Sequence, residues 1–264
     1  MADDILKKVR SLYEKYPYPS RNVTRKKGME TYANWVKNAI GLKNLDYFKG
    51  KYILEAGCGT GELGASLALC GANVVGLDIS MNSLKKAQEL KKKFDIKNWH
   101  LMQSDVLNPA LSKEGAKFDI VISYGVLHHT ANPKKGFEHL VKLVKDKGMI
   151  SIGLYNRIGR ARHRIKRKIV NILAGENFEK RMQLARKLFF LGKMPKQGII
   201  WLADKYAHPH ESYHSVREVK GWFSNNKIKF ISSKPSIGKI AELSELSWML
   251  GRRGAFFVMT GIKE

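Results

Sequence analysis

A glycine-rich segment near residue 57 is the first candidate for chemistry. It follows the apolar residues at 52–54, which predict a short buried strand, and it reads Glu55-Ala56-Gly57-Cys58-Gly59-Thr60-Gly61. Glycine at three alternate positions permits a tight turn and lets a ligand approach the backbone closely. The segment therefore predicts a ligand-binding turn directly after a strand.

Three carboxylates stand at the ends of the strands predicted around this turn. Glu55 ends the first strand, Asp78 ends the run at 73–77, and Asp105 follows the run at 99–103. A carboxylate in the position of Asp78 can chelate ribose hydroxyls, and Asp105 suits an adenine amino group. These acids predict a nucleoside-type cofactor at the carboxyl ends of the strands.

The same segment also satisfies a dinucleotide-binding pattern. Residues 59–64 match G-x-G-x-x-G, and Asp78 falls where a dinucleotide fold places its acid. Glu55 argues against this alternative, because its charge would repel a pyrophosphate. Asp105 and the predicted antiparallel final strand pair also argue against it. A dinucleotide-dependent oxidoreductase nevertheless stays the competing interpretation at the level of the fold.

Alternating strands and helices must position these residues. Periodicity predicts helices at 63–69, 82–94 and 132–145, and strands at 52–54, 73–77, 99–103, 118–123 and 149–154. Two final strands, at 227–233 and 255–262, leave no room for a full crossover and are expected to be antiparallel. The prediction is an α/β protein with a doubly wound, mostly parallel seven-stranded sheet that ends in an antiparallel pair.

Two helical segments add to this pattern. Residues 1–48 are predicted to form an N-terminal helical lid, and residues 49–264 the main domain, with an insert at about 157–226 between strands five and six. The predicted insert helix at 157–173 is amphipathic, with Ile158, Ile165, Ile169 and Ile172 on one face and Lys and Arg on much of the rest. That helix would either pack its apolar face on the sheet or lie on a polyanionic partner.

The glycine-rich segment resembles motif I of the class I S-adenosylmethionine-dependent methyltransferases, a Rossmann-like family with seven strands. Asp78 matches its ribose-binding acid, Asp105-Val106 its adenine-contacting pair, and 124–129 the loop that borders the methionine end of the cofactor. The resemblance covers about residues 48–156. It implies S-adenosyl-L-methionine as cofactor, S-adenosyl-L-homocysteine as product, and no metal. The cofactor-binding residues that it implies are Glu55, Gly57, Cys58, Gly59, Thr60, Gly61, Asp78, Ile79, Asp105, Val106 and Tyr124.

Methyl transfer of this kind is an in-line displacement at a sulfonium methyl, for which a protein mainly supplies orientation and a dry pocket. A base is required only when the acceptor arrives protonated. His129 and Tyr155 lie near the expected mouth of the site and are candidate catalytic residues, with His128 beside them. Tyr16-Pro17-Tyr18-Pro19 resembles a motif that covers the cofactor in some relatives, so Tyr16 and Tyr18 are expected in a lid. The alternative is a turn that ends the first helix.

A polar cluster at 204–214 supplies the remaining candidates. His210 and Glu211 are the preferred pair for acid–base service, and Tyr206, His208 and Tyr213 are expected to contact substrate. The spacing of His208, His210 and His214 would also permit a metal site, but no metal is predicted, because the family's chemistry usually needs none. A structured polar loop is the other alternative.

Composition limits partners and location. Forty-eight Lys and Arg oppose 23 Asp and Glu, giving a formal charge of +25 and a pI near 10.0, which favours RNA or an anionic membrane surface as partner. Two cysteines and an acidic N-terminus without a long apolar run predict a cytoplasmic protein, peripheral at a membrane if the insert binds one.

The expected function is methyl transfer to an acceptor that these residues do not identify. The apolar, aromatic and basic insert favours a small-molecule or lipid-like acceptor. An RNA acceptor and a non-catalytic, cofactor-binding partner protein are the alternatives beside the oxidoreductase. Nothing in the sequence predicts the oligomeric state.

Overall fold

A seven-stranded sheet forms the centre of the computed structural model, which describes residues 2–264 except 22, 24, 112–114, 116, 196, 197, 252 and 253. Its strand order is β3-β2-β1-β4-β5-β7-β6. The first five strands are parallel, and β7 runs antiparallel to both β5 and β6. The predicted sheet is confirmed. The strands are β1 (Tyr52–Ala56), β2 (Asn73–Asp78), β3 (Trp99–Gln103), β4 (Phe118–Tyr124), β5 (Val144–Tyr155), β6 (Ile228–Lys234) and β7 (Phe256–Lys263).

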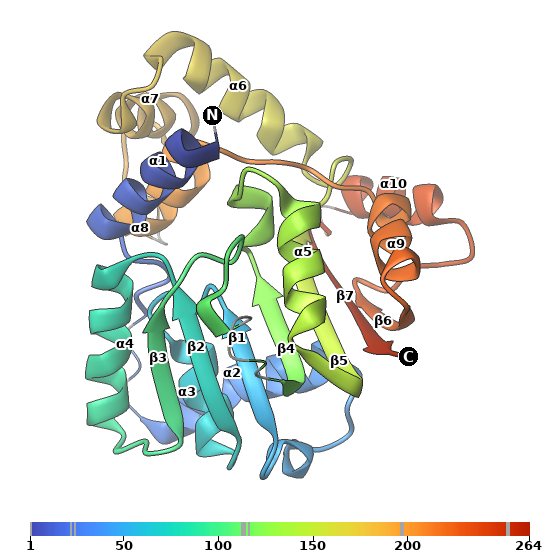
Figure 1. Cartoon of the computed structure of the whole chain (residues 1–264). Helices are drawn as coiled ribbons and strands as arrows, with labels where there is room; N and C mark the ends of the chain where they lie inside the picture. The colour runs from blue at the N-terminus through green and yellow to red at the C-terminus, as the bar shows by residue number, and fades with distance from the viewer. Residues whose placement is uncertain are drawn as a thin grey trace.

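Helices cover both faces of this sheet (Figure 1). One layer comprises α2 (Lys26–Ala39), α3 (Glu62–Leu69) and α4 (Met81–Lys93). The opposite layer comprises α5 (Pro133–Lys142), α9 (Val216–Asn225) and α10 (Ala241–Leu250). α2 thus packs on the sheet itself, although it lies within the segment 1–48 that was expected to act as a lid. Two short 3-10 turns, η1 (Leu45–Phe48) and η3 (Leu127–His129), connect these elements.

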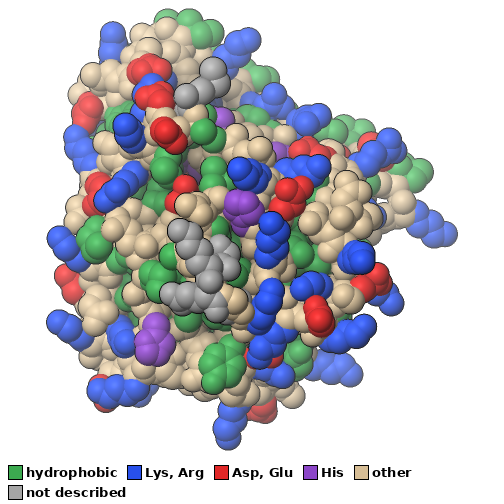
Figure 2. Space-filling model, viewed as in Figure 1, with side chains coloured by type: hydrophobic (Ala, Val, Ile, Leu, Met, Phe, Trp, Pro, Cys, Tyr) green, Lys and Arg blue, Asp and Glu red, His purple; other side chains and the backbone are tan. Residues whose placement is uncertain are grey.

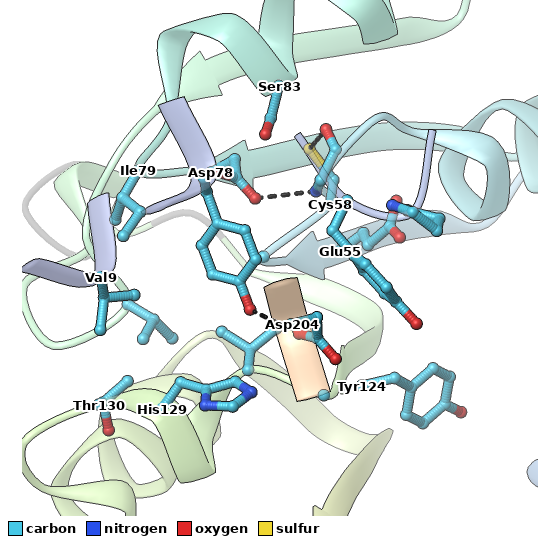
Figure 3. Close-up of a pocket in the computed structure, with 18 of the residues that line it drawn as sticks. Val9, Glu55, Cys58, Asp78, Ile79, Ser83, Tyr124, His129, Thr130 and Asp204 are labelled. Atoms are coloured by element: carbon cyan, nitrogen blue, oxygen red, sulfur yellow. Dashed lines mark hydrogen bonds between the residues drawn. The ribbon is translucent and has the colours of Figure 1, made fainter. Parts of the chain in front are cut away.

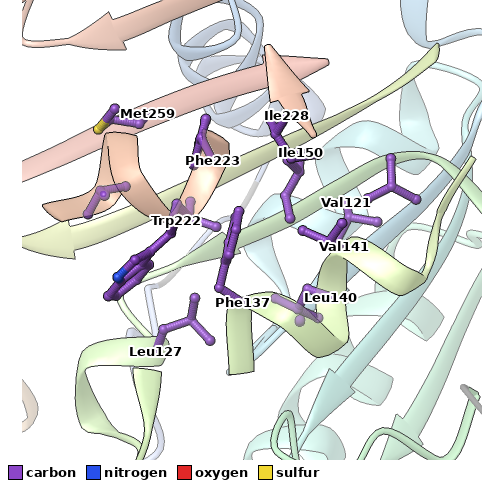
Figure 4. Close-up of a cluster of buried hydrophobic side chains, with 14 of the residues drawn as sticks. Val121, Leu127, Phe137, Leu140, Val141, Ile150, Trp222, Phe223, Ile228 and Met259 are labelled. Carbon is purple, nitrogen blue, oxygen red and sulfur yellow. The ribbon is translucent and has the colours of Figure 1, made fainter. Parts of the chain in front are cut away.

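Aromatic packing holds α5 and α9 against the sheet. Phe137 of α5 stacks on Phe223 of α9 with ring centroids 5.3 Å apart, and Trp222 lies beside them (Figure 4). On the opposite face Trp99 is fully buried between β3 and α3. Each such side chain stabilises the fold by roughly 1.5–3 kcal/mol. These two layers fix the strands whose carboxyl ends build the site.

A third apolar cluster joins four helices above the carboxyl ends of the strands (Figure 1). We call this unit the cap. It consists of α1 (Ala2–Lys15), α6 (Ala161–Ala174), α7 (Phe178–Phe190), α8 (Gly198–Leu202) and the π-helical turn Ala203–Ala207. Lys8 of α1 bonds to Glu176 at 3.0 Å, and Lys15 pairs with Glu179. The N-terminal helix and the basic insert are therefore one structural unit.

The orientation of α6 contradicts one of its two predicted packings. Ile165 and Ile172 are 63% and 71% exposed, whereas Arg167 and the N-cap residue Arg160 are buried. Both arginines pair with the buried carboxylate of Glu211. The expectation that the isoleucine face packs on the sheet is therefore wrong, because paired arginines take that inward position. Among the described residues, no helix has the length and apolar character needed to cross a bilayer.

Candidate functional site

A cavity of about 820 Å³ lies between the carboxyl ends of the strands and the cap. It sits where the strand order reverses, between β1 and β4, which is where open α/β sheets bind their ligands. Figure 3 shows Glu55, Cys58 and Asp78 on one side of this cavity and His129, Thr130 and Asp204 on the other. We refer to these as the loop side and the cap side.

The glycine-rich turn forms the loop side, with a packing role that the sequence did not reveal. Gly57 and Gly59 have φ angles of 80° and 53°, in the left-handed region that favours glycine. A Cβ on Gly57 would lie 2.2 Å from the Val126 side chain, and one on Gly59 would lie 2.2 Å from the Tyr18 carbonyl oxygen. These glycines are thus required first by contacts within the protein, not only by the approach of a ligand.

Asp78 is held at the end of β2 by two backbone donors. Its carboxylate accepts from the Gly59 amide at 2.8 Å and from the Ser80 amide at 2.9 Å. Burial raises the pKa of Asp78, and these two amides partly oppose that effect. The Asp78 side chain lines the cavity, and each carboxylate oxygen keeps a further lone pair for a ligand hydroxyl.

Glu55 supplies the observation that tests the expected cofactor. Its carboxylate lines the cavity, and its Oε2 atom is buried without a hydrogen-bond partner among the described residues. Burial raises the pKa of Glu55, and the nearby Glu62 raises it further. Oε2 itself points towards Gly64 of α3, where an added Cβ would lie 2.5 Å away, while the side chain also borders the cavity. An acidic side chain beside Asp78 at this end of the cavity suits the ammonium of a methionine moiety, as Asp78 suits the ribose hydroxyls. The residues present therefore fit S-adenosylmethionine.

The other predicted cofactor contacts divide into two groups. Thr60 and Gly61 lie outside the lining; the Thr60 hydroxyl bonds to Glu62 at 2.7 Å. Those that line the cavity are Cys58, Ile79, Asp105, Val106 and Tyr124. Burial raises the pKa of the Cys58 thiol, which is therefore neutral. The Tyr124 hydroxyl donates to Ser151 at 2.8 Å, which fixes the ring at the base of the cavity.

The Tyr-Pro segment lies on the glycine-rich turn. The Tyr18 carbonyl accepts from the Thr60 amide at 3.1 Å, and the Ser20 amide donates to the Thr60 hydroxyl at 2.9 Å. Tyr18 lines the cavity, whereas Tyr16 packs in the cap cluster outside it. Tyr13 of α1 takes a place in the lining that the sequence analysis did not assign.

His129 faces the cavity with a defined tautomer. Its Nδ1 lies 2.9 Å from the His210 carbonyl oxygen. A carbonyl can only accept, so Nδ1 carries the proton and Nε2 keeps its lone pair. Burial lowers the pKa of His129 to about 4. The imidazole is therefore neutral near pH 7 and able to take up a proton.

Asp204 and Lys205 of the π-helical turn complete the cap side. The Tyr13 hydroxyl donates to Asp204 at 3.2 Å, and the Lys205 ammonium donates to the Tyr155 hydroxyl at 3.0 Å. Burial alone would raise the pKa of Asp204, but the cations of Lys205 and Arg160 hold it below its usual value. The Arg160 guanidinium lies 3.4 Å from the centroid of the Tyr155 ring. Anionic and cationic groups therefore face one cavity side by side.

Glu211 and His210, the preferred acid–base pair, lie outside the lining. Burial alone would raise the pKa of Glu211, but Arg167 and Arg160 lower it, and both of its oxygens contact these guanidiniums. The structure thus gives Glu211 a positioning contact with Arg160, which does line the cavity. The remaining predicted substrate contacts outside the lining are His128, Tyr206, His208 and Tyr213.

The three histidines considered for a metal have separate surroundings. His208 stacks on His129 with centroids 3.6 Å apart, and His214 bonds to Glu218 at 2.8 Å. Within the part of the chain that the structure describes, no group of three His, Cys, Asp or Glu residues is placed to hold a metal ion. His128 is fully buried and stacks on Tyr155 at 3.8 Å.

Sequence reasoning missed Tyr13, Arg160, Asp204 and Lys205 as lining residues. Tyr13 and Arg160 lie in helical patterns that indicated only packing or solvent exposure. Asp204 and Lys205 begin the polar cluster at 204–214, but a π-helical turn, which nothing in the local pattern indicates, directs them into the cavity. The sequence therefore indicated the polar cluster, but not which of its residues face the cavity.

Comparison with known proteins identifies the chain's relatives. A family model described as a methyltransferase domain matches residues 48–200. An uncharacterized protein of a Synechococcus strain is 26% identical over 88% of this chain and 60% of its own length. The mitochondrial ubiquinone biosynthesis O-methyltransferase of Dictyostelium discoideum is 33% identical over 46% of this chain and 39% of its own length. The chain thus spans about half the length of the curated relatives it matches.

A solved structure shares the fold along the whole chain. Magnesium protoporphyrin IX methyltransferase of Synechocystis PCC 6803, solved with bound SAH, superposes with a TM-score of 0.61 at 17% identity. The match covers 99% of this chain and 100% of that one. At this identity the likeness establishes the fold alone.

Proposed function

The chain belongs to the methyltransferase domain family, and from this premise we propose that it transfers a methyl group from S-adenosylmethionine to a small molecule with an acidic or phenolic hydroxyl. The observation that carries the proposal is the two-sided cavity. Its loop side presents the acidic residues Asp78 and Glu55, and its cap side presents a neutral imidazole beside fixed cations.

The loop side would hold the cofactor. Asp78 has free lone pairs for the ribose hydroxyls, and Glu55 would meet the ammonium of the methionine part. The cofactor supplies an electrophilic methyl group on a sulfonium that is its own leaving group. Cys58 stays a neutral thiol there and offers no competing thiolate.

The cap side would prepare the acceptor. Nε2 of His129 can take the hydroxyl proton, and the His210 carbonyl orients the ring for it. Lys205 and Arg160 would stabilise negative charge that develops on the acceptor oxygen. Tyr155 remains a phenol because burial raises its pKa strongly, so it can orient the acceptor by hydrogen bonding.

The size of the cavity favours a small acceptor over a macromolecule. Cofactor and small-molecule sites usually measure about 300–1,000 Å³, and this one lies in the upper part of that range. It therefore offers space for a compact acceptor beside the cofactor. The name of the Dictyostelium relative, an O-methyltransferase, supports oxygen as the accepting atom.

Transfer of labelled methyl groups tests the proposal. The purified chain is incubated with methyl-labelled S-adenosylmethionine and a cell extract, which is then separated into small-molecule, lipid, RNA and protein fractions. We expect the label in a small molecule, bound through an ether or ester oxygen, and its loss with Asp78→Ala. Label in RNA or protein would contradict the proposed acceptor class, and cofactor binding without transfer would favour a non-catalytic role.

A further inference from the structure

The outward face of α6 carries an apolar stripe that covers nothing in the protein. We define the stripe as Ile165, Ile169, Ile172 and Leu173, all of which are exposed. Their spacing, i, i+4, i+7 and i+8, places them on one side of the helix. The opposite side is the one that packs, since Arg167, Val170 and Ala174 are buried there. The helix is therefore amphipathic with its apolar side turned to solvent.

Cationic side chains border this stripe on both sides. At 100° per residue, Lys166 and Lys168 lie roughly a quarter turn to either side of its centre, and Arg162 lies one turn before it. All three are exposed, and α6 contains no acidic residue. Figure 2 shows hydrophobic side chains and Lys or Arg side by side over the top of the molecule, where the cap lies.

Nearby acids do not cancel this charge. The segment 157–196 contains only two acidic residues, Glu176 and Glu179, and each is paired with a lysine of α1. A second copy of the chain would bring the same cations into opposition across the stripe. RNA would match the charge but would leave the four aliphatic side chains in water. An apolar stripe between rows of cations is complementary to one surface that combines both properties, the acyl and phosphate layers of an anionic bilayer.

We infer that α6 docks the protein in the plane of a membrane rich in anionic phospholipid. The stripe enters the interface, and Lys166, Lys168 and Arg162 extend their charged ends to lipid phosphates. The helix also connects this surface to the cavity, because its N-cap residue Arg160 lines the cavity from the inside. The inference concerns the outer surface of the cap and does not depend on the identity of the acceptor.

Sedimentation with lipid vesicles tests this inference. The full chain is mixed with vesicles of phosphatidylcholine containing phosphatidylglycerol and, in parallel, with vesicles of phosphatidylcholine alone. We expect binding to the anionic vesicles that weakens as salt is added, and Ile165→Glu with Ile172→Glu should reduce it at least about tenfold. Arg162→Glu with Lys168→Glu should also reduce it. Because these side chains are exposed, the variants should keep the circular dichroism and cofactor affinity of the wild type.

α10 offers a matched control. Leu243 and Leu246 are also exposed on a helix surface, but α10 contains neither Lys nor Arg. Leu243→Glu with Leu246→Glu should leave vesicle binding unchanged. Absence of wild-type binding to anionic vesicles, or equal loss in the α10 variant, would overturn the inference. Two other results would also overturn it. If the wild type were a dimer and the Ile165→Glu, Ile172→Glu variant a monomer, the stripe would contact a second copy. If that variant bound RNA and the wild type bound no vesicles, the cations would serve RNA.

Because vesicle binding requires no methyl transfer, the two proposals fail separately. A chain that transfers methyl groups in solution but ignores vesicles would contradict only the docking surface. One that binds anionic vesicles but transfers nothing would contradict only the proposed function.

Discussion

Two neighbouring residues on the cap side of the cavity have opposite protonation states. In the proposed function His129 accepts a proton and so must be neutral, and burial keeps it neutral by lowering its pKa to about 4. Asp204 must stay ionised beside it, and the cations of Lys205 and Arg160 maintain that charge although burial opposes it. One low-dielectric pocket thus holds a neutral imidazole and an ionised carboxylate. The cations beside Asp204 outweigh its desolvation, whereas the carboxylates of Asp204 and Glu211 do not outweigh the desolvation of His129.

Asp78 gives the first prediction at this scale. Asp78→Ala removes a charged acceptor for the ribose and frees the Gly59 and Ser80 amides. Affinity for S-adenosylmethionine should fall by more than about 1 kcal/mol, which calorimetry measures directly. Asp78→Asn retains one acceptor oxygen, so its affinity should lie between those of the wild type and Asp78→Ala. Equal affinities in three folded proteins would refute the assignment of Asp78 to the cofactor.

Sequence reasoning was effective for residues tied to strand ends and weak for residues tied to the cap. Asp78 and Asp105 could be placed because the carboxyl ends of parallel strands share one edge of the sheet, which the strand pattern alone determines. Asp204 could not, since its orientation depends on a π-helical turn and on packing against α1. Glu211 was predicted to act in acid–base chemistry, but its carboxylate is paired with Arg160 and Arg167, which are distant in sequence.

Among the elements, α6 is held by a buried ionic cluster in addition to the buried apolar side chains of Val170 and Ala174. Glu211 contacts the Arg160 and Arg167 guanidiniums, and Arg167 also bonds to the carbonyls of Lys205 and His208. This cluster ties α6 to the segment that carries Asp204 and Lys205. The helix was predicted from its periodicity, but the side that faces inward could not be, because periodicity does not reveal a buried partner for arginine.

Removing the shared partner in this cluster gives the second prediction. Glu211→Gln leaves two buried guanidinium charges without compensation, so unfolding free energy should fall by about 3–5 kcal/mol. Denaturant titration measures the change. The control is Glu176→Gln, which breaks an exposed pair with Lys8 and should have little effect. Similar small effects in both variants would show that the ionic cluster does not stabilise α6.

α9 shows why one helix was missed and how it could have been found. The sequence analysis assigned no element to its residues, yet Ser215 and Glu218 form a reciprocal capping box at its start. This Ser-x-x-Glu spacing precedes the apolar residues Val219, Trp222 and Phe223, which bury against the sheet. The local signal for α9 was therefore present, whereas the signal for the π-helical turn was not.

At the scale of the whole molecule, buried histidines link stability to pH. Burial lowers the pKa values of His128, His129, His163 and His208 in the folded state. Below about pH 6.5 these histidines bind protons in the unfolded state but not in the folded state, which favours unfolding. Stability is therefore complete above that pH and declines as the pH falls from there towards the folded values, which are about 4 for His129 and about 3 for His163.

The third prediction is a steep acid dependence of unfolding. Between about pH 6.5 and pH 5, each buried neutral histidine should lower the free energy of unfolding by on the order of 2 kcal/mol. Urea titration at several pH values measures the change. His208→Asn can still accept from the His210 amide and should flatten the dependence. His100→Gln changes an exposed histidine and should leave it unchanged. A stability that does not vary over this pH range would contradict neutral burial of these rings.

The cap also joins distant parts of the chain around the cavity. The Tyr-Pro segment packs on the glycine-rich turn, and α1, α6, α7, α8 and the π-helical turn share one apolar cluster. The family model establishes the family, and the sheet establishes the fold. In the proposed function, cofactor and acceptor contact different elements of this enclosure, so substitutions on its two sides should have separable effects.

Measuring cofactor affinity and methyl transfer together, on the same variants, tests this two-sided account most directly. With the acceptor found by labelling, Asp78→Ala should lose cofactor affinity. His129→Asn, which can still donate to the His210 carbonyl, should keep that affinity and lose about 100-fold or more in turnover. If His129→Asn turned over at the wild-type rate, or lost cofactor binding as Asp78→Ala does, the division of the cavity into a cofactor side and an acceptor side would be contradicted.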